Sequence, residues 1–385
     1  MTSVAVSTGT ARTRAVRADA PAPAGYFRGW DHIELWVGNA RAFAGWLASG
    51  FGFEFSAYAG PETGRRDSVS YLMTQGDVRF VVTGALGPDS PVAEHVRRHG
   101  DGVARLAIRV TDAVGAFRAA AARGATVVRA PWAEVDQGGV LMRAEVATYG
   151  ETVHTFVDRE AFGGELFLPG FTTDGLPPRP TGPPTGLLGV DHCVGNVGRG
   201  ALGDWVAFYR DVMGFDQLVH FGDDQISTEY TALMSTVVWD GAKVVLPLNE
   251  PADGRRKSQI DEFLEFYGGP GVQHIALRTD DIVTTVAAMR ERGVRFLEVP
   301  ATYYDEVRRR MDGYDLPWDD LVRLGVLVDR DDDGYLLQLF TENVTDRPTL
   351  FLEVIQRVGA TGFGAGNFKA LFEAIERAQA RRGNL

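Results

Sequence analysis

An internal repeat constrains the fold of this 385-residue chain more than any other feature of its sequence. Residues 29–33 (Gly-Trp-Asp-His-Ile) return as 189–193 (Gly-Val-Asp-His-Cys). Farther along, residues 100–107 parallel 269–276, and each copy runs into an amphipathic stretch that ends in Arg-Gly before a further predicted strand. A repeat of this length indicates a duplicated structural unit, so the two halves should fold alike.

Each quarter of the chain has the pattern of a strand, a helix and then several strands. We therefore predict an α+β fold with two domains, each a pair of βαβββ modules that curl into a half-open barrel. A segment with Pro177-Pro178-Arg179-Pro180 and Pro183-Pro184 divides the halves, because neither a helix nor a central strand tolerates so many prolines. The predicted parts are a disordered tail (1–24), an N-terminal domain (25–170), a Pro-rich linker (171–186) and a C-terminal domain (187–385).

The composition is that of a globular protein, with 45% hydrophobic and 23% charged residues. The net charge of −12 argues against nucleic acid or an anionic membrane as a partner, because either would require a basic patch. The chain has one cysteine, Cys193, and no apolar run long enough to span a bilayer. We expect a cytoplasmic protein that forms a homo-oligomer, either a dimer or a tetramer.

Three side chains in the C-terminal half indicate a metal site. His192 and His274 each lie in an apolar, strand-like run, and Glu353 is the one charge in a third such run. A buried carboxylate is costly unless it is paired or bound to metal. The three positions are about 80 residues apart, which places them on successive modules. Two imidazoles and one carboxylate form the facial triad of non-haem Fe(II) oxygenases.

The N-terminal copy lacks this combination, because Arg105 stands where the C-terminal copy has His274. A guanidinium cannot deprotonate to become a ligand, so the N-terminal domain should be free of metal. His32 and His154 are accordingly expected to be hydrogen-bonded core residues.

Further polar and aromatic side chains fall on predicted strands and one predicted helix of the C-terminal half. A strand at 227–238 and a second at 243–251 form a hairpin, with Pro247 at an edge or bulged position and Asn249 on the same face. Ser258 caps a helix, and a strand at 335–340 places Gln338 and Phe340 on one face. Such amide and aromatic groups suit a planar, mostly neutral substrate.

The last segment combines a Gly-rich loop with an amphipathic helix. Gly362, Gly364 and Gly366 make the loop flexible, and Asn367 is positioned to cap the helix. We expect this helix both to pack on the domain and to act as a lid over the site. Its apolar stripe comprises Phe368, Leu371, Phe372, Ile375 and Ala378.

With these motifs in this order, the chain resembles the 4-hydroxyphenylpyruvate dioxygenases, a family of vicinal-oxygen-chelate (glyoxalase-like) fold enzymes. The resemblance extends over nearly the whole chain after the first two dozen residues. It is strongest at residues 190–192, 247–251, 257–261, 271–276, 333–340, 351–353 and 362–368.

The resemblance implies that Fe(II) is held by His192, His274 and Glu353. It implies catalytic roles for Gln259, Gln338, Asn249 and Ser235. It also implies substrate contacts from Gln273, Phe340, Phe351, Phe363, Asn367, Phe368 and Pro247. Strict strand alternation turns Gln273 away from His274, so its contact requires a bulge or an indirect role.

The implied reaction belongs to tyrosine catabolism and converts 4-hydroxyphenylpyruvate, an α-keto acid, and O2 into homogentisate and CO2. It combines oxidative decarboxylation, ring hydroxylation and side-chain migration. A metal site with a charge near +1 would neutralise the substrate anion, which fits a set of pocket residues without Arg or Lys.

Three alternatives remain open at the level of sequence. Hydroxymandelate synthases share the fold, metal and substrate, but the resemblance implies aliphatic residues where this chain has Asn249 and Phe368. An extradiol catechol dioxygenase would leave Asn249, Gln259 and Gln338 without a role. A non-enzymatic binding protein of the glyoxalase/bleomycin-resistance type would keep its ligand unreacted.

Overall fold

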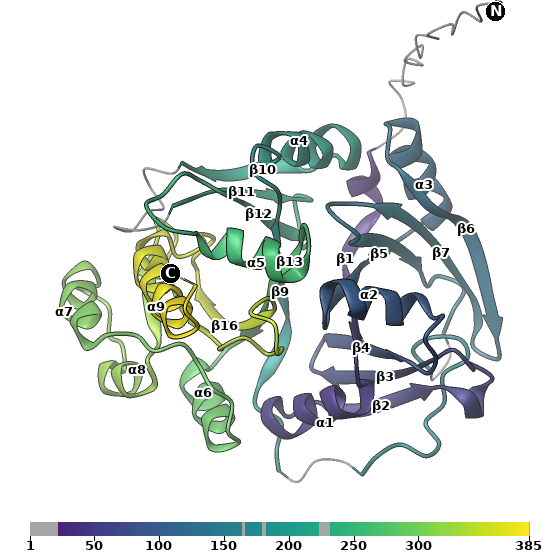
Figure 1. Ribbon diagram of the computed structural model, residues 1–385, viewed down its shortest axis with the longest axis horizontal. Helices are drawn as coiled ribbons and strands as arrows, with labels where there is room; N and C mark the ends of the chain where they lie inside the picture. Colours follow the sequence, from purple (N-terminus) through teal and green to yellow (C-terminus); the bar gives the residue numbers. More distant parts are fainter. Residues whose placement is uncertain (1–21, 164–165, 179–181, 223–231, 385) are drawn as a thin grey trace, which may run out of the picture.

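The computed structural model describes residues 22–163, 166–178, 182–222 and 232–384. Most of the predicted tail therefore lies outside the described residues, although Pro23 and Ala24 already belong to a 3-10 helix, η1 (Pro23–Tyr26). The two halves of the chain lie side by side, with β1 and β9 near the boundary between them (Figure 1). Among the described residues, no helix is long and apolar enough to cross a membrane.

The N-terminal half contains one eight-stranded sheet with short helices around it. Its strands are β1 (Phe27–Val37), β2 (Glu54–Ala59), β3 (Ser68–Gln75), β4 (Val78–Ala85), β5 (Gly102–Val110), β6 (Val127–Asp136), β7 (Gly139–Ala147) and β8 (Val153–Asp158). Its helices after η1 are α1 (Ala40–Phe51), η2 (Pro61–Thr63), α2 (Pro91–His99) and α3 (Ala113–Ala122).

The C-terminal half contains a second eight-stranded sheet. Its strands are β9 (Leu187–Asn196), β10 (Asp216–Phe221), β11 (Leu233–Trp239), β12 (Val245–Pro251), β13 (Gly271–Thr279), β14 (Leu327–Arg330), β15 (Tyr335–Phe340) and β16 (Phe351–Val358). Its helices are α4 (Leu202–Ala207), the π-helix η3 (Phe208–Met213), α5 (Gln259–Tyr267), α6 (Ile282–Glu291), α7 (Ala301–Arg310), α8 (Trp318–Leu324), η4 (Ala365–Asn367) and α9 (Phe368–Arg381).

The two sheets have the same strand order, which confirms the predicted duplication. The orders are β2-β3-β4-β1-β5-β8-β7-β6 and β10-β11-β12-β9-β13-β16-β15-β14. Each module has a βαβββ pattern, and the two modules of a half join through their antiparallel first strands, β1 with β5 and β9 with β13. The α+β fold with paired βαβββ modules is therefore confirmed.

Two local features differ from the sequence expectations. The Arg292-Gly293 pair does not lead into a strand, because α7 and α8 stand between α6 and β14 and only Phe296 forms an isolated bridge with Thr341. The strand of Pro247 is not at an edge, because β12 lies between β11 and β9 and pairs with β11 without a register shift. Proline is tolerated there because the described pairing with β9 involves only Leu248 and Asn249.

The first strand of the predicted hairpin lies partly outside the described residues. Residues 227–231 lie outside the described residues, and β11 begins at Leu233. The two strands are joined by the five residues 240–244 and not by a two-residue Asp240-Gly241 turn, because the Asp240 side chain accepts hydrogen bonds from the backbone N–H groups of residues 242, 243 and 244 and holds a longer loop.

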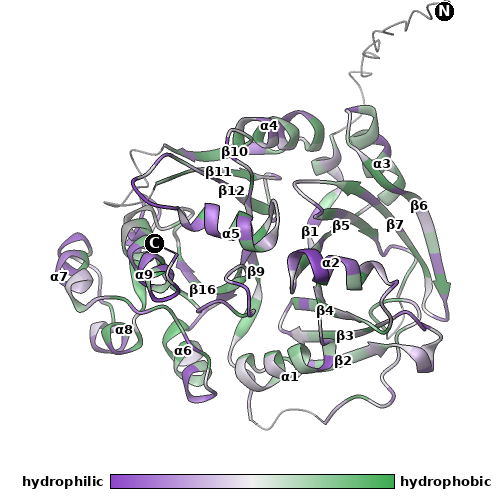
Figure 2. Ribbon diagram, viewed as in Figure 1, coloured by the Kyte–Doolittle hydropathy of each residue, from purple (hydrophilic) through white to green (hydrophobic). Residues whose placement is uncertain are grey.

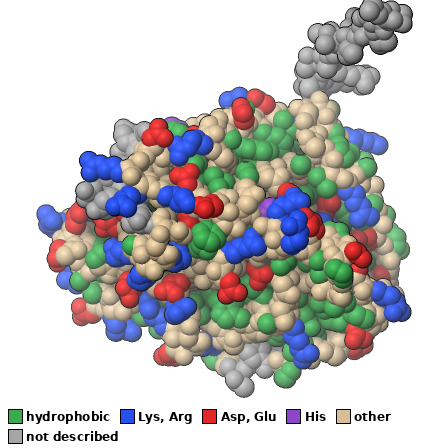
Figure 3. Space-filling view, viewed as in Figure 1, with side chains coloured by type: hydrophobic (Ala, Val, Ile, Leu, Met, Phe, Trp, Pro, Cys, Tyr) green, Lys and Arg blue, Asp and Glu red, His purple; other side chains and the backbone are tan. Residues whose placement is uncertain are grey.

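Hydrophobic residues concentrate on the strands, while α2, α5 and α7 carry hydrophilic stretches (Figure 2). One continuous core includes buried residues from both halves, and the rings of Phe27 and Phe215 meet across it at 5.9 Å between centroids. On the face in Figure 3, acidic and basic side chains intermingle.

Candidate active site

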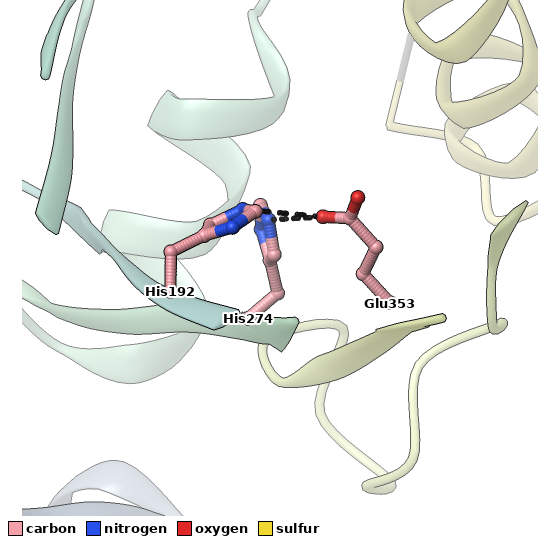
Figure 4. Close-up of side chains that lie close together, drawn as sticks. All are labelled: His192, His274 and Glu353. Atoms are coloured by element: carbon pink, nitrogen blue, oxygen red, sulfur yellow. Dashed lines mark ion pairs between the residues drawn. The ribbon is translucent and has the colours of Figure 1, made fainter. Parts of the chain in front are cut away.

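Three neighbouring strands bring His192, His274 and Glu353 together. β13 lies between β9 and β16, and its Ala276 pairs with His192 on one side and with Glu353 on the other. The Nε2 atoms of both histidines lie 3.3 Å from Oε2 of Glu353. Figure 4 shows the two rings converging on that carboxylate. The structure thus places the three residues of the sequence-predicted triad at one point. The expectation of one ligand per module is wrong, because His274 in β13 and Glu353 in β16 belong to the same module.

The hydrogen bonds of the two rings show that this cluster fits a cation. Nδ1 of His192 lies 2.7 Å from Asp191 Oδ1, and Nδ1 of His274 lies 3.1 Å from the amide oxygen of Gln273. Because both acceptors are oxygens, each Nδ1 carries the proton, and a neutral ring then presents an Nε2 lone pair to Glu353. Two lone pairs facing a carboxylate repel unless a proton or metal ion lies between them. The ligand atoms lie within 4.8 Å of one another, which suits one metal ion.

The electrostatics agree with that arrangement. Burial opposes a charge on His192, but the negative Glu353 and the hydrogen bond to Asp191 raise the pKa of His192 to about 9. Burial lowers the pKa of His274, and the hydrogen bond to Glu353 does not compensate for it. Burial would raise the pKa of Glu353, but the charge and hydrogen bond of His192 hold it below its usual value.

Two residues that the sequence reasoning missed orient His192. Asp191 lies between His192 and Arg357, and Arg357 donates two hydrogen bonds of 2.9 Å to its carboxylate oxygens. Burial opposes ionisation of Asp191, but hydrogen bonds from His192 and Arg357 hold its pKa well below the usual range. The internal repeat could have indicated both residues, because Asp31-His32 and Arg159 stand at the corresponding positions of the N-terminal half.

A cavity opens directly onto the triad and encloses about 630 Å³ of space, including its mouth. Among the described lining residues, none is Lys or Arg. The sequence-predicted residues that line the cavity are Ser235, Pro247, Asn249, Gln259, Gln273, Gln338, Phe340, Phe351, Phe363 and Phe368. Lining residues to which the sequence reasoning assigned no contact are Val194, Phe221, Leu233, Val237, Leu371 and Phe372.

Gln273 reaches the cavity because β13 contains a bulge. The pairing with β9 shifts register between Val272 and His274, so Gln273 is the extra residue and strict alternation is broken there. From the sequence, a contact of Gln273 with the substrate required either a bulge in its strand or an indirect role. The structure has the bulge, and Gln273 also accepts a hydrogen bond from Nδ1 of His274.

Asn367 is the one predicted contact residue that is absent from the lining. It is fully buried, and its side-chain oxygen accepts a 2.6 Å hydrogen bond from the Tyr303 hydroxyl. Asn367 does precede α9, but its side chain makes no capping hydrogen bond. Ser258, in contrast, caps α5 as predicted, in a reciprocal arrangement with Asp261.

The C-terminal helix α9 forms one wall of the cavity through Phe368, Leu371 and Phe372. In the loop before it, Gly364 has φ +71°, and an added Cβ would lie 2.5 Å from the amide nitrogen of Gln338. Glycine is therefore needed for this close approach. Beyond the end of α9, Arg382 donates hydrogen bonds of 2.6 and 3.2 Å to the buried carboxylate of Glu262.

The N-terminal half holds a different arrangement at the equivalent place. Arg105 donates hydrogen bonds to Glu34 and Glu145 instead of facing a second imidazole. Ala107, the equivalent of Ala276, pairs with Thr155, so Thr155 stands where the other half has Glu353. His32 is buried with its Nδ1 2.6 Å from Asp31, and His154 is buried against the Tyr209 hydroxyl at 2.8 Å. Both are hydrogen-bonded core residues, as expected.

Comparisons with known proteins agree with this architecture. Residues 29–158 and 189–339 match the Glyoxalase/Bleomycin resistance protein/Dioxygenase superfamily model. The chain is 45% identical to a 4-hydroxyphenylpyruvate dioxygenase of Neurospora crassa, with 93% of each chain covered. It is 44% identical to a protein of the same name from Xenopus tropicalis, with 94% of each covered. The chain belongs to the 4-hydroxyphenylpyruvate dioxygenase family.

This chain is also similar to a solved structure of a hydroxymandelate synthase. A triple mutant of 4-hydroxymandelate synthase from Streptomyces coelicolor superposes with a TM-score of 0.81. It is 37% identical to this chain, and the alignment covers 92% of this chain and 99% of the synthase. Membership of the 4-hydroxyphenylpyruvate dioxygenase family, together with the convergent His/His/Glu cluster, implies an enzyme with a metal cofactor.

Proposed function

We propose that this protein is an Fe(II)-dependent dioxygenase that converts 4-hydroxyphenylpyruvate and O2 into homogentisate and CO2 in tyrosine catabolism. The observation that carries the proposal is the convergence of two imidazole Nε2 atoms on one carboxylate oxygen at the wall of an amide- and aromatic-lined cavity. Family membership supports the choice of substrate and reaction.

His192, His274 and Glu353 would hold the iron from one side and leave coordination positions open towards the cavity. When bound there, Fe(II) would supply the chelation of the α-keto acid and the activation of O2. Asp191 and Gln273 keep the two imidazole rings turned towards Glu353 by accepting hydrogen bonds from their Nδ1–H groups.

The remaining cavity residues orient the substrate and exclude water. Ser235 and Asn249 are directly opposite each other on β11 and β12, and Gln259 and Gln338 add amide groups from α5 and β15. These neutral groups can hydrogen-bond the substrate without competing with the metal for its carboxylate. The edges and faces of Phe340, Phe351, Phe363 and Phe368 enclose the ring.

Hydroxymandelate synthesis is the alternative with specific support, because of the similarity to the synthase structure. Both reactions start from the same substrate, so product identification separates them. An extradiol dioxygenase would cleave a catechol, and a binding protein would return the keto acid unchanged.

The test combines a product assay with ligand substitutions. We expect wild-type protein supplied with Fe(II), 4-hydroxyphenylpyruvate and O2 to release homogentisate and CO2. His192→Ala, His274→Ala and Glu353→Ala should each lose metal and turnover, because each removes a donor from a preformed site. His32→Ala, at the equivalent place in the other half, is the matched control and should keep its full metal content. Full iron loading and normal turnover in Glu353→Ala would refute the ligand assignment.

A cytoplasmic location and a homo-oligomeric state, dimer or tetramer, stay predictions. Fractionation of cells that express the protein and light scattering of the purified protein would test them.

A further inference from the structure

A four-residue cluster of Asp, His, Arg and Phe occurs in both halves of the molecule. In the C-terminal half, Asp191 contacts the His192 ring and accepts two hydrogen bonds from Arg357. The Phe363 ring lies edge-on to His192, with the ring centroids 5.5 Å apart, and 5.3 Å from the guanidinium carbon of Arg357.

The N-terminal half repeats these contacts. Asp31 contacts the His32 ring and accepts hydrogen bonds of 2.6 and 2.9 Å from Arg159. The Phe167 ring lies edge-on to the His32 ring, with the two ring centroids 5.4 Å apart. The guanidinium carbon of Arg159 lies 4.2 Å from the Phe167 ring centroid. Arg159 and Arg357 both stand four residues after the equivalent positions Thr155 and Glu353.

What the cluster connects differs between the halves. Arg159 donates to the carbonyl of Phe167, in the segment that precedes the linker. Arg357 donates a hydrogen bond to the carbonyl of Gly362. Gly362 directly precedes Phe363, which lines the cavity, and stands six residues before the first residue of α9. Only the C-terminal copy therefore lies between the proposed metal ligand and the wall that closes the cavity.

We propose that Asp191 and Arg357 are positioning residues that join the metal ligand His192 to the base of the C-terminal wall. The same hydrogen bonds then set the orientation of the His192 ring and the place of Phe363 at the cavity. This inference rests on the proposed role of His192 as a ligand.

The geometry explains why arginine is needed at position 357. Its planar fork contacts both oxygens of Asp191 and so fixes the plane of the carboxylate, which in turn fixes the imidazole. Two further hydrogen bonds hold the carbonyls of Gly362 and, at 3.5 Å, Ala360. A lysine would keep the charge but could not hold both carboxylate oxygens in one plane and the carbonyl at once.

The experiment compares Arg357→Met and Arg357→Lys with Arg159→Met, which removes the same contacts in the other half. Metal-depleted protein is titrated without oxygen with Co(II), whose absorption bands report the ligand geometry, and thermal unfolding is measured in parallel. We expect both Met variants to unfold at lower temperature. Arg357→Met alone should weaken Co(II) binding by about 10- to 100-fold and change the spectrum, with a smaller loss in Arg357→Lys.

A second readout is limited proteolysis of residues 360–384 in the Co(II)-loaded proteins. Cleavage should accelerate in the Arg357 variants and stay at the wild-type rate in Arg159→Met. Wild-type Co(II) affinity in both Arg357 variants would overturn the inference, as would an equal loss of affinity in Arg159→Met. Failure of the wild-type protein to bind Co(II) would instead refute the proposed function, and the inference with it.

Discussion

Asn249 and Phe368 are the two cavity-wall side chains at which the sequence resemblance predicts a difference from the hydroxymandelate synthases. Asn249 pairs with Ser235 across β11 and β12, so its amide is held on a rigid hairpin. Phe368, the first residue of α9, lies edge-on to Phe221 with ring centroids 5.1 Å apart. A substrate ring between a fixed amide and a flat aromatic wall has few orientations available, and a displacement of about 1 Å can change a rate roughly 100-fold.

At this residue scale we predict that Phe368→Ile, alone or with Asn249→Ile, diverts part of the product from homogentisate to 4-hydroxymandelate. The isoleucine side chains remove the flat wall and the hydrogen-bonding group, so the benzylic carbon gains access to the oxidant. Chromatography of the products measures the ratio, with Phe221→Leu as a comparison that changes another aromatic side chain of the cavity wall. An unchanged ratio in the double variant would remove this explanation, and 4-hydroxymandelate as the main wild-type product would overturn the assignment.

At the scale of elements, α9 packs on the C-terminal domain and forms one wall of the cavity, while its action as a lid stays a prediction. Ala370, Leu371 and Ala374 pack against Leu297, Leu327, Phe340 and Phe351, so the helix covers a hydrophobic cluster as well as the cavity. Deleting the helix would expose that cluster. Changing the contact of Arg382 with Glu262 beyond its end is therefore a sharper test of closure.

We predict that Arg382→Ala raises KM and increases unproductive consumption of the keto acid, with little change in metal content. The substitution leaves the buried Glu262 with Asn384 as its remaining described hydrogen-bond partner, so the end of α9 should open more often. Oxygen consumed per homogentisate formed is the measurement. Arg381→Ala, one residue earlier at the end of the same helix, is the control. If Arg382→Ala consumed as little oxygen per homogentisate formed as the wild type does, this contact would not govern closure of the cavity.

At the scale of the whole molecule, the two halves share an interior. An added Cβ on Gly195 would lie 2.3 Å from the Tyr149 ring, so β9 approaches the N-terminal half at a glycine. Tyr209 of the C-terminal half is fully buried, and its hydroxyl lies 2.8 Å from both His154 and Thr148 of the N-terminal half. The stability of the interface therefore depends on buried polar contacts as well as apolar packing.

This interface should weaken in acid. Burial lowers the pKa of His154 from 6.5 to about 4, so between these values the unfolded chain binds a proton that the folded protein excludes. Stability is fully present above pH 6.5 and is lost as the pH falls towards 4. The loss at pH 5 should be on the order of 2 kcal/mol.

Denaturant unfolding at pH 7 and pH 5 checks this prediction. The wild type should lose more stability between the two pH values than His154→Gln, which cannot take up the proton. His220→Gln, a change at an exposed histidine, serves as the control and should behave as the wild type does. Equal pH dependence in all three proteins would contradict the assignment.

The sequence alone determined the duplication, the βαβββ modules and the triad residues. These features depend on local patterns, namely strand-like runs, turn residues and a charge or imidazole in an apolar segment, and they recur in the repeat. The resemblance implied most of the cavity residues as well, and the structure places all of them but Asn367 at the cavity wall.

Only the tertiary structure decided the features that depend on strand register and on contacts between distant segments. The bulge that turns Gln273 to the cavity arises from the pairing of β13 with β9. Asn367 meets Tyr303 because side chains of α7 hydrogen-bond to the loop that precedes α9. Arg357 meets Asp191 although they are 166 positions apart in the sequence. Such contacts leave no local pattern, because the partner of each side chain is set by which strands become neighbours when the sheet closes.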